Sequence, residues 1–296
     1  MKTAIGIDLG GTNVKGILMN EAGEILLQHS IPTIDDEEGK WRENVLEMVE
    51  YLKNNYPDKI ELIGLSAPGL ANDENTSIAH LPNRLQGLEN FKWGKYLNTK
   101  TYVLNDAHAA LMAEAKYGEL MGYKNAILLT LGTGIGGGIL INGELYQGQG
   151  QMAGHLGHIS INYSDDEPSI LGMPGSLEYA FGNYSIKRRS RGHYDSVEKL
   201  VADFQKGETF ATWLWLDSVR KLALAITSLI NTLSPEIIVL SGGISNANEL
   251  LFKHLEEFVH LYEFKPKGKI TPIVKAKFQE LTGAIGAAGF AFSKQL

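Results

Sequence analysis

Short apolar runs alternate with turn-forming residues over the first forty positions, and apolar positions at helical spacing follow them. The first two runs flank Gly10-Gly11-Thr12. This pattern predicts an antiparallel hairpin with a Gly-Gly-Thr tip, followed by a third strand. From 41 to 55 the apolar residues recur every three or four positions, which predicts an amphipathic helix. The three strands are expected at 4–9, 14–19 and 25–31.

The rest of the chain mixes strands with helices. A strand, glycine-containing loop and strand follow one another at 5–17 and again at 126–140, which indicates two related β-rich halves. Segment 164–175 has the composition of a loop. The remaining expected strands are 60–66, 101–104, 126–131, 139–141, 159–162, 237–240 and 273–275, and the remaining helices 107–117, 197–204, 210–233, 248–259 and 283–292.

The glycine-rich loops carry the first chemical signal. Residues 132–137 read GTGIGG, which satisfies the dinucleotide-binding pattern G-x-G-x-x-G. That pattern needs a helix immediately after it, and here a strand and a hairpin are expected, so it is excluded. Glycine-rich hairpin tips can still bind phosphate through exposed backbone N–H groups. One such turn is usually only a tight hairpin, but two of them with Asp8 beside the first favour a phosphate and magnesium site, the ion held through water.

Composition and charge limit the classes of partner. The chain has 296 residues, 44% of them hydrophobic and 21% charged, with a net charge of −7. This acidic balance argues against nucleic acid and acidic membrane surfaces as partners. There are no cysteines, which removes disulfides and thiolate ligands. The N-terminus is too acidic for a signal peptide and no apolar stretch is long enough to span a membrane, so a cytoplasmic protein is expected.

Six motifs in order resemble the ROK family of bacterial sugar kinases, repressors and uncharacterised open reading frames, within the actin-like ATPase superfamily. The resemblance covers about residues 4–290. The motifs are DLGGT at 8–12, LSAPG at 65–69, NDAHAA at 105–110, LGTGIGGGI at 131–139, GHLGH at 154–158 and LSGGI at 240–244.

The resemblance implies an α/β protein with the actin-like ATPase (ribonuclease H-like) fold, its two domains surrounding a central cleft that holds the active site. The smaller domain would comprise 1–117 plus 281–296, and the larger one 118–280. The implied activity is transfer of the γ-phosphoryl group of ATP to a hexose hydroxyl, with Mg²⁺ as a further cofactor. Glucose is the leading substrate; fructose, allose, mannose and N-acetylhexosamines stay open. A homodimer is also expected.

The resemblance also assigns residues to roles. Asp106 would be the catalytic base that accepts the proton of the attacking sugar hydroxyl. Cofactor binding would fall to Asp8, Gly10, Gly11, Thr12, Gly132, Thr133, Gly134, Gly242 and Gly243, the last two forming the turn that binds adenosine. Sugar binding would fall to Gly69, Asn83, Asn105, Asp106, His155, His158 and Glu178.

The sequence departs from the family at two places. Family kinases usually carry Glu-x-Gly-His, and here His155 replaces the glutamate, so an acceptor-only carboxylate becomes a group that can donate. The family's three zinc-binding cysteines are replaced by Ser169, Leu171 and Ser176. A site without thiolates holds structural zinc poorly, so no zinc is expected.

Three other functions are weighed against a kinase. A sugar-responsive repressor would need a DNA-binding segment before Asp8, where only seven residues precede it. A sugar-binding protein without catalysis is suggested by His155. An actin-like phosphotransferase acting on a carboxylate or polyphosphate is disfavoured by the sugar-side matches at Asn105, His158 and Glu178.

Overall fold

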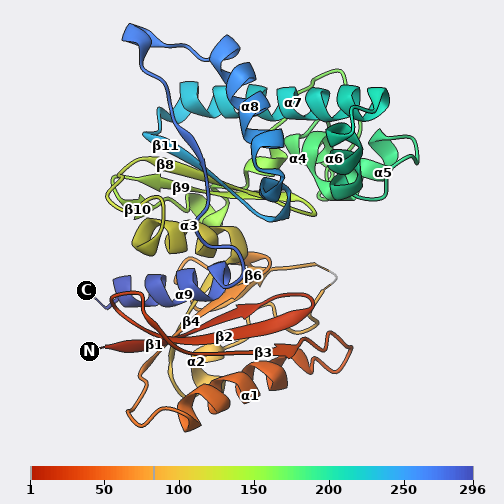
Figure 1. The fold of residues 1–296 in the computed structure, drawn as a ribbon. Helices are drawn as coiled ribbons and strands as arrows, with labels where there is room; N and C mark the ends of the chain where they lie inside the picture. The colour runs from red at the N-terminus through yellow and green to blue at the C-terminus, as the bar shows by residue number, and fades with distance from the viewer. Residues whose placement is uncertain (1, 83, 296) are drawn as a thin grey trace. The chain divides into compact units, whose positions relative to one another are not determined.

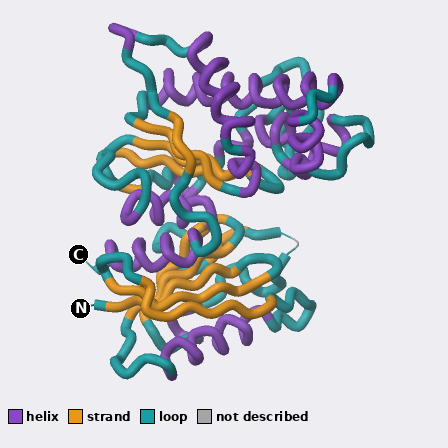
Figure 2. Tube along the Cα trace, in the orientation of Figure 1, coloured by secondary structure: helices purple, strands orange, loops and turns teal. Residues whose placement is uncertain are grey.

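The structure, a computed structural model, describes residues 2–82 and 84–295, which fall into two compact units. Unit 1 comprises Met1–Gly122, Leu145–Ala153 and Lys277–Leu296, and unit 2 comprises Tyr123–Glu144 and Gly154–Ala276. Each unit contains one five-stranded sheet with helices packed on it (Figures 1 and 2). No described helix is both long enough and apolar enough to cross a membrane.

The sheet of unit 1 has the strand order β3-β2-β1-β4-β7. Strands β1 and β2 are antiparallel, whereas β1, β4 and β7 run parallel, so their carboxyl ends share one edge. In the register of these three strands Asp8 lies opposite Ser66, and Ala67 lies opposite Asn105. The bounds are β1 Thr3–Leu9, β2 Asn13–Asn20, β3 Ile25–Pro32, β4 Leu62–Ala67 and β7 Lys100–Asn105.

Helices cover both faces of this sheet (Figure 1). Helix α1 (Trp41–Asn54) packs its apolar stripe on one face, with Trp41 fully buried. Helix α9 (Thr282–Ser293) packs on the other face, beside α3 (Asp106–Tyr117). The small residues of α9 meet glycines in the sheet, because a side chain at Gly6 or Gly64 would collide with the α9 backbone. The helix therefore lies directly against the strands.

Unit 1 also holds short elements that the periodicity did not predict. A two-stranded ribbon, β5 (Leu70–Ala71) with β6 (Ile78–His80), follows β4. The single-turn helix α2 (Trp93–Tyr96) precedes β7. These elements are two to four residues long. Such segments are too short to repeat a hydrophobic pattern, which explains why the spacing gives no sign of them.

The sheet of unit 2 has the order β10-β9-β8-β11-β12, with β8, β11 and β12 parallel and β9 antiparallel to β8. Its core contains Phe181, Trp215 and the apolar face of the long helix α7. The strands are β8 Ala126–Leu131, β9 Ile135–Ile141, β10 Glu144–Leu145, β11 Ile237–Ser241 and β12 Ile273–Lys275; the helices are α4 Leu177–Phe181, α5 Ile186–Arg189, α6 Val197–Gln205, α7 Thr209–Leu233 and α8 Glu249–Tyr262.

Two expectations for unit 2 were wrong. Strand β9 begins at Ile135, four residues earlier than expected, and so contains glycines that are rare in strands. Packing explains one of them, because a side chain at Gly137 would collide with Leu156. The expected strand 159–162 is not a strand: Ile159 and Ile161 bond locally to the 175–177 segment instead of joining the sheet.

Candidate active site

The first glycine tip, between β1 and β2, presents backbone donors. Gly10 N–H donates to the carbonyl of Asn13 at 3.1 Å, which closes the turn. Thr33 then binds both tip carbonyls, donating from Oγ1 to Gly10 O at 2.7 Å and from its N–H to Thr12 O at 2.9 Å. Within the described residues, the N–H groups of Gly11 and Thr12 have no acceptor. The tip can therefore bind an anion. Thr33 was missed because it lies beyond the motif.

Asp8 lies at the carboxyl end of β1, just before this tip. Its Oδ1 accepts from Ser66 Oγ at 3.0 Å, and the backbone of α9 approaches so closely that a Cβ at Gly283 would lie 2.5 Å from the carboxylate. The pKa of Asp8 is raised to about 6, chiefly by burial and also by the charge of Asp106, whereas the Ser66 hydrogen bond and the Lys15 charge oppose the rise. This carboxylate is costly to hold ionised without a cation nearby.

Asn105 and Asp106 lie where β7 passes into α3. Asn105 caps the helix: its Oδ1 accepts from Ala107 N–H at 2.9 Å, and its Nδ2 donates to Gly69 O at 2.9 Å. Asp106 is the first helical residue and is exposed, with Oδ1 accepting from Ala107 N–H at 2.8 Å. A helix N-terminus favours the ionised form of a carboxylate there.

Gly69 is required by backbone geometry. Its φ is +97°, and a Cβ there would lie 2.6 Å from the carbonyl oxygen of His80 on β6. Any side chain would therefore push the β5–β6 ribbon away from the Asn105 cap. Asn83, the other sugar residue expected near here, lies outside the described residues.

His108 is a residue of this region that the sequence analysis missed. It is buried on α3, two positions after Asp106, and its Nε2 lies 2.9 Å from Ala153 O. The contact fastens segment Leu145–Ala153 to α3, within unit 1. The sequence signal that could have identified it is a single histidine among the alanines at the start of this capped helix.

The second glycine tip, between β8 and β9, is braced from one neighbouring segment. Gly132 N–H donates to Gly134 O at 3.0 Å, which closes the turn. The N–H groups of Asn183 and Tyr184 donate to the carbonyls of Gly132 and Thr133 at 3.0 and 2.9 Å. As at the first tip, outside donors engage the carbonyls of the turn.

The third glycine turn follows β11. Gly242 has φ +89°, and a Cβ there would lie 2.5 Å from Leu131 O at the end of β8, so only glycine fits. A short 3₁₀ helix, Gly243–Ala247, follows at once, and α8 begins only at Glu249. The helix N-terminus directly after the turn is thus that of the 3₁₀ segment.

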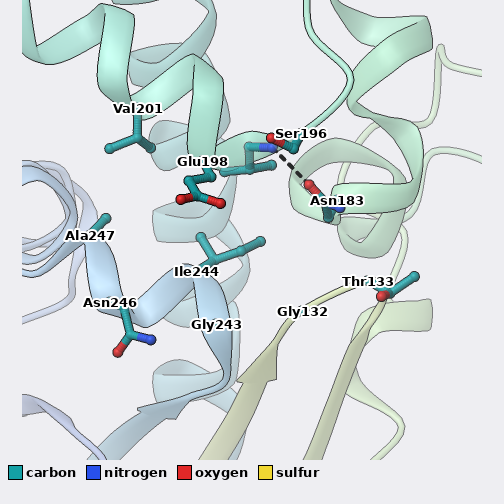
Figure 3. A pocket seen from close by; sticks show the side chains of 11 residues that line it. Gly132, Thr133, Asn183, Ser196, Glu198, Val201, Gly243, Ile244, Asn246 and Ala247 are labelled. Carbon is teal, nitrogen blue, oxygen red and sulfur yellow. Dashed lines mark hydrogen bonds between the residues drawn. The ribbon is translucent and has the colours of Figure 1, made fainter. Parts of the chain in front are cut away.

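The second and third turns line one pocket of 590 Å³ within unit 2 (Figure 3). Glu198, from α6, points into it, and Asn183 Oδ1 accepts from Val197 N–H at 2.7 Å on its wall. Most of the lining residues lie outside the motifs, because α6 and the 182–185 segment form part of the pocket wall. The lining residues are Gly132, Thr133, Asn183, Ser196, Val197, Glu198, Val201, Gly243, Ile244, Asn246 and Ala247.

In unit 2, His155 directly precedes the 3₁₀ turn Leu156–His158, and His158 is the last residue of that turn. Their rings are 6.4 Å apart between centroids and nearly parallel, at 19°. Gly157 between them packs so tightly that a side chain would collide with the carbonyl of Ile135. Nδ1 of His158 is buried and, within residues 2–82 and 84–295, has no hydrogen-bond partner.

Glu178 is buried and already holds two backbone segments. Its Oε1 accepts from Ile135 N–H at 3.2 Å, and its Oε2 accepts from Ile170 N–H at 3.0 Å. A side chain at Gly134 would collide with Oε1. The carboxylate therefore ties the second glycine tip to the 164–175 loop, and each oxygen keeps one lone pair for another donor.

Hydrogen bonds hold the loop in which the family's zinc cysteines would lie. Ser169 Oγ accepts from Met173 N–H at 3.0 Å, and Ser176 Oγ caps α4 by accepting from Tyr179 N–H at 3.1 Å. Leu171 is exposed. No group of three His, Asp or Glu side chains among the described residues could hold a metal ion.

Known proteins match this sequence over nearly its whole length. The sequence model of the ROK family matches residues 4–294. A glucokinase of Halalkalibacterium halodurans is 32% identical over 87% of this chain and 85% of its own. An N-acetyl-D-glucosamine kinase of Haemophilus influenzae is 29% identical over 98% of this chain and 99% of its own.

Solved structures show the same fold. The ROK hexokinase of Thermus thermophilus superposes with a TM-score of 0.88 at 26% identity, covering 99% of both chains. A ROK glucokinase of Streptomyces griseus, in complex with glucose and AMPPNP, gives 0.79 at 22% identity, covering 98% of this chain and 99% of the other. The chain therefore belongs to the ROK family, has the actin-like ATPase fold of ROK hexokinases, and is a phosphotransferase that acts on a sugar hydroxyl.

Proposed function

We propose that the protein is a cytoplasmic, ATP-dependent hexose kinase, with Asp106 as the catalytic base. The observation that carries this is an exposed carboxylate at the N-terminus of α3, at the sheet edge that also holds Asp8. Asp106 accepts the proton of the sugar hydroxyl as that oxygen attacks the γ-phosphorus of ATP. The N-terminus of a helix such as α3 favours negative charge, and a charged carboxylate is the form that can accept a proton.

Unit 2 binds the nucleotide in this proposal. Its 590 Å³ pocket is lined by Gly132, Thr133 and Gly243, and apolar side chains of α6 and the 3₁₀ segment offer a surface for adenine. The complex of the Streptomyces griseus glucokinase with AMPPNP supports ATP as the donor. The two glycine tips present N–H groups to phosphates, and Gly134 packs on Glu178, which holds the second tip in place.

Asp8 is the residue that would hold magnesium through water. A carboxylate oxygen is the ligand type that Mg²⁺ prefers, and a cation there would offset the burial that raises the pKa of Asp8. The ion would neutralise charge on the transferring phosphoryl group. No zinc is proposed.

Glucose is the leading sugar, and N-acetyl-D-glucosamine is the main alternative because relatives of both names match. Asn105 retains one amide hydrogen beyond the bond to Gly69. His158 offers an unsatisfied ring nitrogen, and Glu178 offers the free lone pairs of its carboxylate. His155, in place of the family's glutamate, would contribute a donor where other members have only an acceptor.

One assay tests the proposal. ADP release is coupled to a spectrophotometric readout, with ATP, Mg²⁺ and a panel of hexoses and N-acetylhexosamines. We expect turnover with at least one sugar, and a changed ranking in His155→Glu if this residue contacts the sugar, since a lost buried hydrogen bond costs about 1–3 kcal/mol. Calorimetric sugar binding without ADP release would instead favour the sugar-binding protein that lacks catalysis.

A further inference from the structure

Arg84 lies against the first glycine tip. A Cβ built on Gly11 would be 2.5 Å from Nη2 of Arg84, so the guanidinium stands directly over the backbone of Gly11. Arg84 itself is an exposed residue of unit 1, and it precedes α2 in the chain. A cationic fork therefore lies beside the two N–H groups, of Gly11 and Thr12, that have no acceptor within the described residues.

The nearby acidic side chains do not pair with this cation. Arg84 borders a surface pocket of 850 Å³ whose acidic lining residues are Asp35, Asp36, Glu37 and Glu89. Asp36 pairs with Lys40 at 3.3 Å; Asp35 Oδ1 accepts from a backbone N–H at 3.1 Å; Glu89 Oε1 accepts from another at 2.6 Å. For Arg84, no hydrogen bond or ion pair exists with any residue that the structure describes.

The other cation close to Asp8 is already engaged. Lys15 lies opposite Asp8 in the β1–β2 register, and its Nζ donates to Glu280 O at 3.0 Å. Lys15 is thus held by that carbonyl, whereas the guanidinium of Arg84 has no acceptor among the described residues. A planar guanidinium matches the geometry of phosphate oxygens and can bind two of them at once.

We propose that the guanidinium of Arg84 binds the transferring phosphoryl group, together with the N–H groups of Gly11 and Thr12. This rests on the proposed kinase function. In the step, the sugar oxygen forms a bond to the γ-phosphorus while the bond from phosphorus to the β,γ-bridging oxygen breaks. The hydroxyl proton passes to Asp106, and the bridging oxygen leaves with its electron pair on ADP. Arg84 stabilises the charge on the equatorial phosphoryl oxygens during this transfer.

Nucleotide binding tests the proposal without turnover. Titration calorimetry compares AMPPNP with ADP, each with Mg²⁺, for the wild type, Arg84→Gln and Arg84→Lys. Only AMPPNP carries a γ-phosphate group. Arg84→Gln should therefore lower the affinity for AMPPNP about 10-fold and the affinity for ADP by less than about 2-fold. Arg84→Lys should recover part of the loss, since it keeps the charge without the fork. Lys92→Gln is the control, because it removes another exposed cation from unit 1.

Turnover provides the second measurement. With the sugar found active in the panel, kcat of Arg84→Gln should fall at least about 100-fold, whereas Lys92→Gln should match the wild type. If Arg84→Gln keeps both the wild-type kcat and the wild-type ratio of AMPPNP to ADP affinity, the Arg84 proposal is overturned and the kinase assignment stands. An equal loss of affinity for AMPPNP and ADP also overturns the Arg84 proposal. If the wild type neither turns over nor binds nucleotide, the kinase proposal fails and the Arg84 proposal falls with it.

Discussion

At the scale of single residues, the proposed chemistry depends on two carboxylates in different surroundings. Asp106 is exposed at a helix N-terminus, which favours its charged form. Asp8 is covered by α9 and neighbouring strands, which raises its pKa to about 6. The first suits a base that must accept a proton, and the second suits a cation-dependent site.

Asp106→Asn tests the base. Asparagine cannot accept the hydroxyl proton but keeps a side-chain oxygen for the N–H of Ala107, so kcat should fall at least about 100-fold with sugar affinity nearly unchanged. The coupled assay and sugar calorimetry measure the two quantities. Glu43→Gln is the matched control, as it removes an exposed acid from the first turn of α1. Near-normal turnover in Asp106→Asn would reject the assignment.

Asp8→Asn tests the buried carboxylate through stability. The folded-state pKa is raised from the ordinary value of 3.8 to about 6, so ionisation destabilises the fold progressively as pH rises from about 4 to 6, and fully above that range. Measured in EDTA at pH 7.5, the variant should gain up to about 3 kcal/mol in free energy of unfolding, and the gain should vanish below pH 4.

The control for this experiment is Asp58→Asn, which changes an exposed acid of the same unit. Its free energy of unfolding should follow the wild type across the pH range. An Asp8→Asn variant that is no more stable than the wild type at pH 7.5 would show that the carboxylate is well solvated. Its kinase activity should fall in either case, because the amide cannot hold magnesium as a carboxylate does.

At the scale of elements, short segments outside the motifs hold the glycine tips in position. Thr33, at the end of β3, binds the carbonyls of the first tip. The Asn183–Tyr184 backbone does the same for the second, and Glu178 joins that tip to the 164–175 loop. The carbonyls of both tips therefore accept hydrogen bonds from donors outside the turns.

The 164–175 loop and its boundary at Ser176 should need no zinc. Protein purified without a metal-binding tag should contain none by elemental analysis, and EDTA should leave its melting temperature unchanged. Ser176→Ala should cost about 1 kcal/mol by removing the α4 cap, whereas Ser164→Ala, at an exposed position of the same loop, should cost almost nothing. One zinc per chain with unfolding in chelator would contradict this account.

At the scale of the whole molecule, contacts define two units with separate hydrophobic cores. Unit 1 includes Leu145–Ala153, a segment between two strands of unit 2, because His108 and its neighbours bind it. The expected domain bounds, 1–117 plus 281–296 and 118–280, stay predictions, as does the homodimer. Membership of the ROK family holds for 4–294 and so covers both units.

The sequence by itself determined the long elements, the fold class and the family, because hydrophobic period and ordered motifs are local signals. The hairpin with the Gly-Gly-Thr tip, the α1 and α7 helices, and the Asn105 cap before Asp106 all follow from such signals. The start of the glycine-rich β9 was expected too late, because the packing of Gly137 against Leu156 leaves no local pattern in the sequence. Residues 159–162 were wrongly expected to form a strand, because their hydrogen bonds to the 175–177 segment leave no such pattern either.

Only the tertiary structure decided which distant residues meet. Nothing near Gly11 in sequence indicates Arg84, 73 positions away by their numbers, nor does anything near Gly132 indicate Glu198. These pairs arise because loops from separate elements converge once the sheets form. The raised pKa of Asp8 has the same origin, since α9, from the far end of the chain, covers a carboxylate that the sequence presents beside a turn. The pKa of a buried group depends on the burial and the charges that its neighbours in space provide, and those neighbours are determined only when the chain folds.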